Sequence, residues 1–80
     1  MKPIRFSRHA RRRTQQRGLT QDEVEAILQQ PERVEPSAKE RLNAFGPVLG
    51  GVARVTFRET AEEVVVVTVV RQRKAGEARS

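Results

Sequence analysis

The chain has 80 residues, no cysteine, one histidine and a formal net charge of +6 at pH 7. A chain of this length holds one small domain with one core, and this composition excludes disulfides and an ordinary zinc site. Its longest apolar runs are far shorter than the roughly 20 residues that cross a bilayer. Because the sequence also shows no signal peptide, we expect a cytoplasmic protein that does not enter a membrane.

Positive charge is concentrated near the two ends of the sequence. Residues 1–17 carry seven basic side chains and no acid, whereas residues 18–70 carry nine acids and five bases. A surface of one sign concentrates phosphate-bearing partners. The alternative is a merely solvated helix, since arginine outnumbers lysine thirteen to three throughout. The local absence of acids favours a polyanion as the partner, with RNA as the expected one.

Two helices are predicted in the N-terminal part. Ser7 precedes a run without glycine or proline, and a glycine follows that run, which predicts a helix over 8–17 with a serine N-cap. Thr20 with Glu23 three residues later is a capping-box pattern. Apolar residues then recur at helical spacing up to Pro31, so a second helix is expected there.

Four short segments after these helices are predicted to be strands, because turn residues such as Gly46-Pro47 separate them. They are residues 33–35, 41–45, 51–58 and 63–71. The last two are rich in valine, threonine and phenylalanine, as strands are, whereas the first two could be partly loop. Valine on both faces of the last segment suggests a central strand or a second packing layer such as a dimer contact.

These elements predict an α+β domain with two N-terminal helices on one face of a three- to four-stranded antiparallel sheet. We expect the domain to span residues 1–71 and a flexible basic tail to follow at 72–80.

A polar sheet face is also predicted, because apolar and polar residues alternate in the segment 51–58. The expected register sets Arg58 opposite Val64, Thr56 opposite Val66 and Arg54 opposite Thr68. This pairing would produce one surface of mixed guanidinium and hydroxyl groups.

The first helix carries the residues best suited to phosphate chemistry. His9, Arg13 and Arg17 are spaced four apart and share one stripe of the helix. Cations on one stripe repel each other and gain from a shared anion, and arginine can donate two parallel hydrogen bonds to a phosphodiester. The alternative for either arginine is a salt bridge to an acid of the second helix or of the sheet.

Metal-free RNA cleavage needs a base for the 2′-hydroxyl, a cation for the phosphate and an acid for the leaving oxygen. His9 is the candidate proton-transfer group, although a lone histidine often only caps a turn or bonds a carbonyl. Together with the arginines it supplies two of the three roles. Thr68, Arg54 and Glu59 are weak candidates for the third.

Other catalytic signatures are missing from the sequence, which has no nucleophile elbow, P-loop or dinucleotide-binding fingerprint. We therefore expect no cofactor and no metal. Three phenylalanines without tyrosine or tryptophan also disfavour single-strand binding by base stacking.

The string Phe6-Ser7-x-His9-Ala10-x-x-Arg13-x-x-x-Arg17-Gly18-Leu19-Thr20-x-x-Glu23-Val24 resembles the bacterial family catalogued as domain of unknown function 4258. The resemblance covers about residues 4–71. It implies helices packed on a four-stranded antiparallel sheet, in the barnase-, colicin- and RelE-like (BECR) fold of small metal-independent ribonucleases, many of them toxins. It points to His9, Arg13 and Thr68 as site positions. Gln16 stands where an acidic residue commonly precedes the equivalent of Arg17, so a Glu–Arg pairing is not expected.

The sequence supports two hypotheses. The first is an RNA-directed, toxin-like, metal-independent endoribonuclease. Its catalytic residues would be His9, Arg13 and Thr68, and its nucleic-acid-binding residues Arg12, Arg17, Arg54 and Arg58. The second is a module of the same fold that binds nucleic acid or a protein without catalysis. Besides RNA, a cognate antitoxin and a second copy of the chain are candidate partners.

Overall fold

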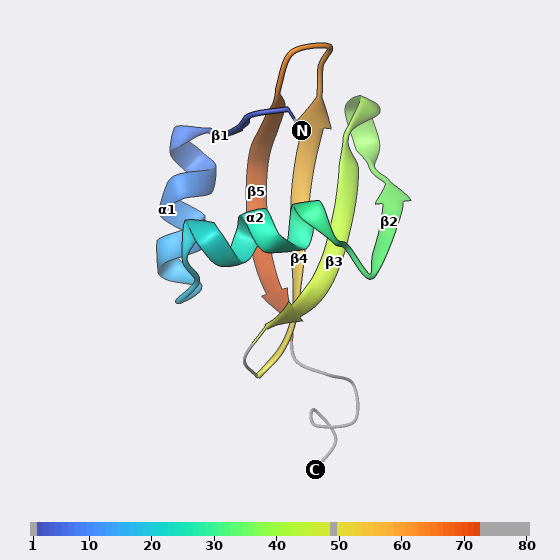
Figure 1. Cartoon of the computed structure of the whole chain (residues 1–80). Coiled ribbons are helices and arrows are strands. Elements are labelled where there is room, and N and C mark those ends of the chain that lie inside the picture. The colour runs from blue at the N-terminus through green and yellow to red at the C-terminus, as the bar shows by residue number, and fades with distance from the viewer. Residues whose placement is uncertain (1, 49, 73–80) are drawn as a thin grey trace.

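The structure, a computed structural model, describes residues 2–48 and 50–72. In chain order its elements are β1 (Ile4–Phe6), α1 (Arg8–Gln16), α2 (Gln21–Gln29), β2 (Arg33–Pro36), the short 3-10 helix η1 (Ala38–Glu40), β3 (Leu42–Val48), β4 (Gly51–Glu59) and β5 (Val64–Gln72). The strands form one sheet; α2 crosses in front of it and α1 runs alongside β5 (Figure 1). Within the described residues no helix is both long enough and apolar enough to span a membrane.

Both predicted helices are confirmed, and each begins at the predicted cap. The Ser7 hydroxyl accepts a hydrogen bond from the Ala10 amide at 3.0 Å. At α2, the Thr20 hydroxyl accepts from the Glu23 amide while the Glu23 carboxylate accepts from the Thr20 amide. These bonds satisfy amide groups that have no partner inside the helix, which is why the caps mark both starts.

The sheet differs from the expected three to four antiparallel strands. Its order is β1-β5-β4-β3-β2, and β1 pairs with β5 in parallel, so the sheet is mixed and has five strands. The α+β class and the helices on one face are correct. The strand β1 was missed because it has only three residues and pairs with a segment some sixty positions away (Ile4 with Val64), which leaves no local pattern.

The predicted break at Gly46-Pro47 is wrong, because β3 continues through both residues to Val48. The pairing of β2 with β3 ends at Phe45, so the proline lies where β3 has no neighbour on that side and its missing N–H breaks no ladder bond. Gly46 has a packing role: a Cβ there would lie 2.7 Å from Cγ1 of Ile27. The glycine therefore lets α2 lie close against the sheet.

The predicted register between β4 and β5 is also wrong, by one residue at Arg58 and by two residues at Thr56 and Arg54. Glu59 pairs with Val64, and therefore Arg58 lies opposite Val65. A bulge then leaves Val67 without a partner. The observed polar-face pairs are Thr56 with Thr68 and Arg54 with Val70. The turn explains the first residue of the difference, because the Thr60 hydroxyl accepts hydrogen bonds from two turn amides and closes a four-residue loop over residues 60–63. The bulge adds the second residue.

The core lies between the two helices and one face of the sheet. Its buried members include Ala10, Val24, Ile27, Val55, Phe57, Val66 and Val69. The strand β5 lies between β1 and β4, which agrees with the central position that its valines suggested. Of the predicted tail, Gln72 is the last residue of β5, and residues 73–80 lie outside the described residues.

Candidate nucleic-acid interface

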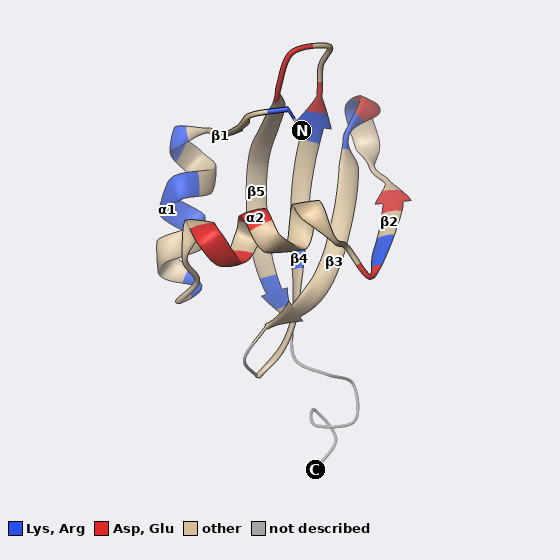
Figure 2. Ribbon diagram, viewed as in Figure 1, with Lys and Arg blue, Asp and Glu red and all other residues tan. Residues whose placement is uncertain are grey.

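The outer surface of α1 is the most cationic part of the described structure. Figure 2 shows basic segments along this helix and no acidic one. Four of its basic residues are exposed and Arg13 is half-buried. The exposed ones are Arg8, Arg11, Arg12 and the C-cap residue Arg17. We call these five arginines together with His9 the α1 basic surface.

Packing of α1 determines which side chains reach solvent. Ala10 and Thr14 are buried against the core, and the Thr14 hydroxyl donates to the Ala10 carbonyl at 2.8 Å. These two residues lie one turn apart, so they hold one side of the helix against β5. The rest of the helix is left to polar and charged side chains.

His9 is exposed and lies in a shallow hollow of about 300 Å³ with Arg8 and Arg12. An imidazole beside two guanidinium groups can exchange a proton while the arginines bind an anion. The predicted stripe is only partly brought together. Arg13 contacts Gln16 at 3.5 Å, and Arg17 lines a different pocket.

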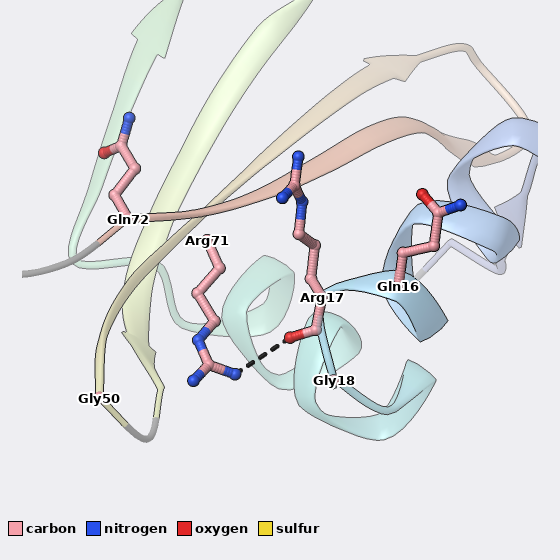
Figure 3. A pocket seen from close by; sticks show the side chains of 6 residues that line it. All are labelled: Gln16, Arg17, Gly18, Gly50, Arg71 and Gln72. Carbon is pink, nitrogen blue, oxygen red and sulfur yellow. Dashed lines mark hydrogen bonds between the residues drawn. The ribbon is translucent and has the colours of Figure 1, made fainter.

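The pocket that contains Arg17 lies where the end of α1 meets the end of β5 (Figure 3). Arg71 of β5 donates a hydrogen bond to the Arg17 carbonyl at 3.0 Å. Sequence reasoning missed Arg71, because only the fold brings the last turn of the first helix beside the last strand. The one available signal was the concentration of positive charge near the C-terminal end of the sequence.

The predicted sheet residues lie on the face that the helices leave open. Arg54 and Arg58 alternate with Val55 and Phe57 of the core, and therefore point to the opposite side of the sheet. Thr68 is on the same open face. In the described part of the chain, no hydrogen bond joins His9 or any arginine of α1 to these sheet residues. The sequence-predicted catalytic set is thus divided between the helix and the open face.

Arg54 is half-buried. Its Nε is buried and has no hydrogen-bond partner among the described residues, and its cross-strand neighbours are Phe45 and Val70. Next to it, Thr56 is buried and donates to the Asn43 side chain at 2.7 Å. Long arginine stems commonly cover apolar surface in this way.

Three cations outside α1 form ion pairs with acids at the sheet. The ion pairs are Lys2 with Glu59 at 2.8 Å, Arg5 with Glu63 at 3.1 Å and Arg33 with Glu35 at 2.9 Å. The hydrogen bond from Arg5 lowers the pKa of Glu63 below its ordinary value, and the charges of Arg5 and Arg58 act in the same direction. Two of the seven cations counted in residues 1–17 are therefore already paired.

The five arginines of the α1 basic surface differ in this respect, since none forms an ion pair with a carboxylate within residues 2–48 and 50–72. The same residues contain no group of three or more histidine, cysteine or acidic side chains that could hold a metal ion. The α1 basic surface therefore consists of guanidinium groups and one exposed imidazole.

Comparison with known proteins identifies a family. The family model DUF4258, a domain of unknown function, matches residues 6–71. No curated protein and no solved structure matches the chain.

Proposed function

Since the chain belongs to the DUF4258 family, a family without an assigned function, we propose a function from the site: the protein binds the phosphate backbone of RNA through the α1 basic surface. One observation carries this proposal, namely the set of α1 arginines without a carboxylate partner in the described residues. Unpaired cations on one surface bind phosphates and release counterions. The resemblance to BECR-fold ribonucleases, which we propose as a distant relationship, favours RNA over DNA.

Binding can be tested by fluorescence anisotropy with a single-stranded RNA and a DNA duplex over a range of salt concentrations. If the α1 basic surface contacts about four phosphates, the logarithm of the association constant should fall against the logarithm of salt concentration with a slope of about −3. Lack of affinity at low salt would refute the proposal. A preference for the DNA duplex would refute its RNA-specific part.

A second candidate function is metal-independent RNA cleavage at His9, and the hollow with Arg8 and Arg12 favours it. In this reaction the imidazole takes the proton of a 2′-hydroxyl, and the 2′-oxygen attacks the adjacent phosphorus. The bond to the 5′-oxygen breaks and that oxygen gains a proton, which leaves a cyclic phosphate and a 5′-hydroxyl. The arginines would stabilise the charge on the phosphate in the transition state.

Thr68 does not share this hollow, so the proton for the leaving oxygen would come from water or from His9 itself after it has acted as base. His9→Gln tests the reaction, because His9 is exposed and the variant should fold normally. We expect RNA binding to persist and cleavage to fall by at least about 100-fold. Equal cleavage by this variant would remove His9 from the mechanism.

We also propose a cytoplasmic location and a protein partner, which is either an antitoxin or a second copy of the chain. Analytical ultracentrifugation of the purified protein would test self-association. Co-purification with the product of an adjacent gene would test a dedicated partner.

A further inference from the structure

A second hollow, separate from that of His9, opens at the far end of α1. It has a volume of about 430 Å³ and is lined by Gln16, Arg17, Gly18, Gly50, Arg71 and Gln72. Three segments meet in this pocket: the end of α1, the residue before β4 and the end of β5 (Figure 3). Its volume lies within the range of small-ligand sites.

Two glycines line this pocket. Both have positive φ, 71° at Gly18 and 85° at Gly50, a conformation that other residues rarely adopt. A Cβ at Gly18 would lie 3.6 Å from Nη1 of Arg71, and one at Gly50 would lie 3.4 Å from its Nη2. Since neither glycine carries a side chain, the Arg71 guanidinium lies against bare backbone.

The charged side chains that line this pocket are all positive. Arg17 and Arg71 are both exposed, and neither forms an ion pair with an acid of the described residues. Nη1 of Arg71 is used by the Arg17 carbonyl, which leaves Nη2 and the Arg17 side chain for a ligand. Two like charges beside one hollow attract an anion and repel each other less once it binds.

The directions of these side chains suit two anionic groups better than one. In Figure 3 the Arg17 side chain extends away from the guanidinium of Arg71, so the cations lie on different sides of the pocket. Successive phosphates of a polynucleotide are held apart by the sugar between them. A phosphodiester chain that crosses the pocket can therefore place one phosphate at each arginine.

We propose that this pocket binds two successive phosphates of a nucleic-acid strand, one at Arg17 and the next at Arg71. The proposal rests on the proposed function, because the strand is the RNA that the α1 basic surface binds. His9 and Arg17 are eight residues apart, or about 12 Å along the helix axis. The same strand can reach both hollows over a few nucleotides, and β5 thereby contributes to the binding site.

Amide chemical shifts of ¹⁵N-labelled full-length protein can locate the contact during titration with a short oligouridylate. We expect the Gly18 and Gly50 amides to shift together with those of Arg8 and Arg12. Arg17→Gln is the cleanest variant, because the bond from Arg71 uses the backbone carbonyl of residue 17 and survives the substitution. It should weaken RNA binding by about three- to tenfold and reduce the salt slope by about 0.7.

Arg71→Lys should keep most of the affinity, whereas Arg71→Gln should lose it to the same extent as Arg17→Gln. Arg33→Gln is the matched control, since it removes one exposed arginine at the other edge of the sheet and should leave affinity within about twofold. Shifts at Arg8 and Arg12 without shifts at Gly18 and Gly50 would overturn this inference alone. Absence of any shift would overturn the proposed function as well.

Discussion

The arginines of α1 and three cations beside the sheet are the same kinds of residue in opposite situations. Lys2, Arg5 and Arg33 each form an ion pair with a glutamate, at 2.8 to 3.1 Å. The arginines of α1 have no such partner among the described residues, although α2 carries acids in its own first turn. Those acids, Asp22 and Glu23, lie at the positive end of α2, where they stabilise that helix.

Because of this difference, a count of basic residues overstates the positive charge that is available to a ligand. Exposed ion pairs contribute little to stability, but they neutralise the charge that a phosphate would otherwise attract. The cations of the N-terminal region therefore divide into a paired group next to the sheet and an unpaired group on the helix. We expect the two groups to respond differently to substitution.

The largest effect should be on stability, in a variant that disturbs the packing of the fold and leaves both groups of cations unchanged. Gly46→Ala places a Cβ within 2.7 Å of the Ile27 side chain and forces α2 away from β3. We expect it to lower the free energy of unfolding by about 1–3 kcal/mol, measured by urea denaturation. Pro47→Ala, at an exposed position of the same strand, is the control and should cost less. RNA affinity of the folded Gly46→Ala protein should stay unchanged, and a large loss would show that affinity depends on overall fold.

The next largest effect should be on RNA affinity when three unpaired arginines are replaced together. In Arg8→Gln/Arg11→Gln/Arg12→Gln the salt slope should decrease by about 2 and affinity should fall by more than tenfold. Stability should change little, because all three side chains are exposed. Anisotropy and thermal unfolding of the same sample measure both quantities.

The matched control removes the same charge from the paired group, as Lys2→Gln/Arg5→Gln/Arg33→Gln. Since those cations are already neutralised by glutamates, we expect a clearly smaller loss of affinity. Equal losses in the two triple variants would mean that only net charge matters, and the division into two groups would be wrong.

A smaller effect should appear in the pH dependence of stability. The folded-state pKa of Glu63 is lowered, chiefly by the hydrogen bond from Arg5. The Arg5–Glu63 interaction therefore stabilises the fold above the unfolded-state pKa, about 4.3 for glutamate, and is lost as pH falls through the lower folded-state value. Glu63→Gln should unfold at a lower temperature than wild type at neutral pH, and the difference should vanish in acid. A gap for Glu63→Gln that stays constant as the pH falls would contradict the assignment.

The smallest effect is expected at Lys2 and Glu59. Their side chains are 39% and 47% exposed, so solvent screens the 2.8 Å contact. A double-mutant cycle with Lys2→Met and Glu59→Gln should give a coupling energy of about 0.5 kcal/mol or less, and less still in high salt. A coupling energy well above 1 kcal/mol would show that this pair has a structural role greater than its exposure indicates.

Local signals in the sequence were sufficient for the helices. The caps at Ser7 and Thr20 lie within three residues of the amides they bind, so the pattern is visible in a short window. The strand β1 and the β4–β5 register depend on pairing across the chain and on hydrogen bonds of the Thr60 turn. Spacing within a single segment cannot encode either of them.

The candidate site was predictable to a similar extent. Helical spacing predicts one stripe of His9, Arg13 and Arg17, of which the structure leaves His9 and Arg17 exposed and Arg13 half-buried. The ion pair between Arg5 and Glu63 and the meeting of Arg17 with Arg71 join residues more than fifty positions apart. Only the folded chain shows that the first cation is neutralised and that the second pair lines a pocket.

The helix α1 is attached to the sheet at both ends, and this affects how it binds a flexible nucleic-acid strand. At its start, the Ser7 amide donates to the Val66 carbonyl of β5, and at its end Arg71 of the same strand holds the Arg17 carbonyl. The helix is thus anchored twice to one strand and has little freedom to tilt or shift along it. On association, most of the conformational entropy is therefore lost by the nucleic acid, because its torsion angles must adjust to a fixed spacing of cations.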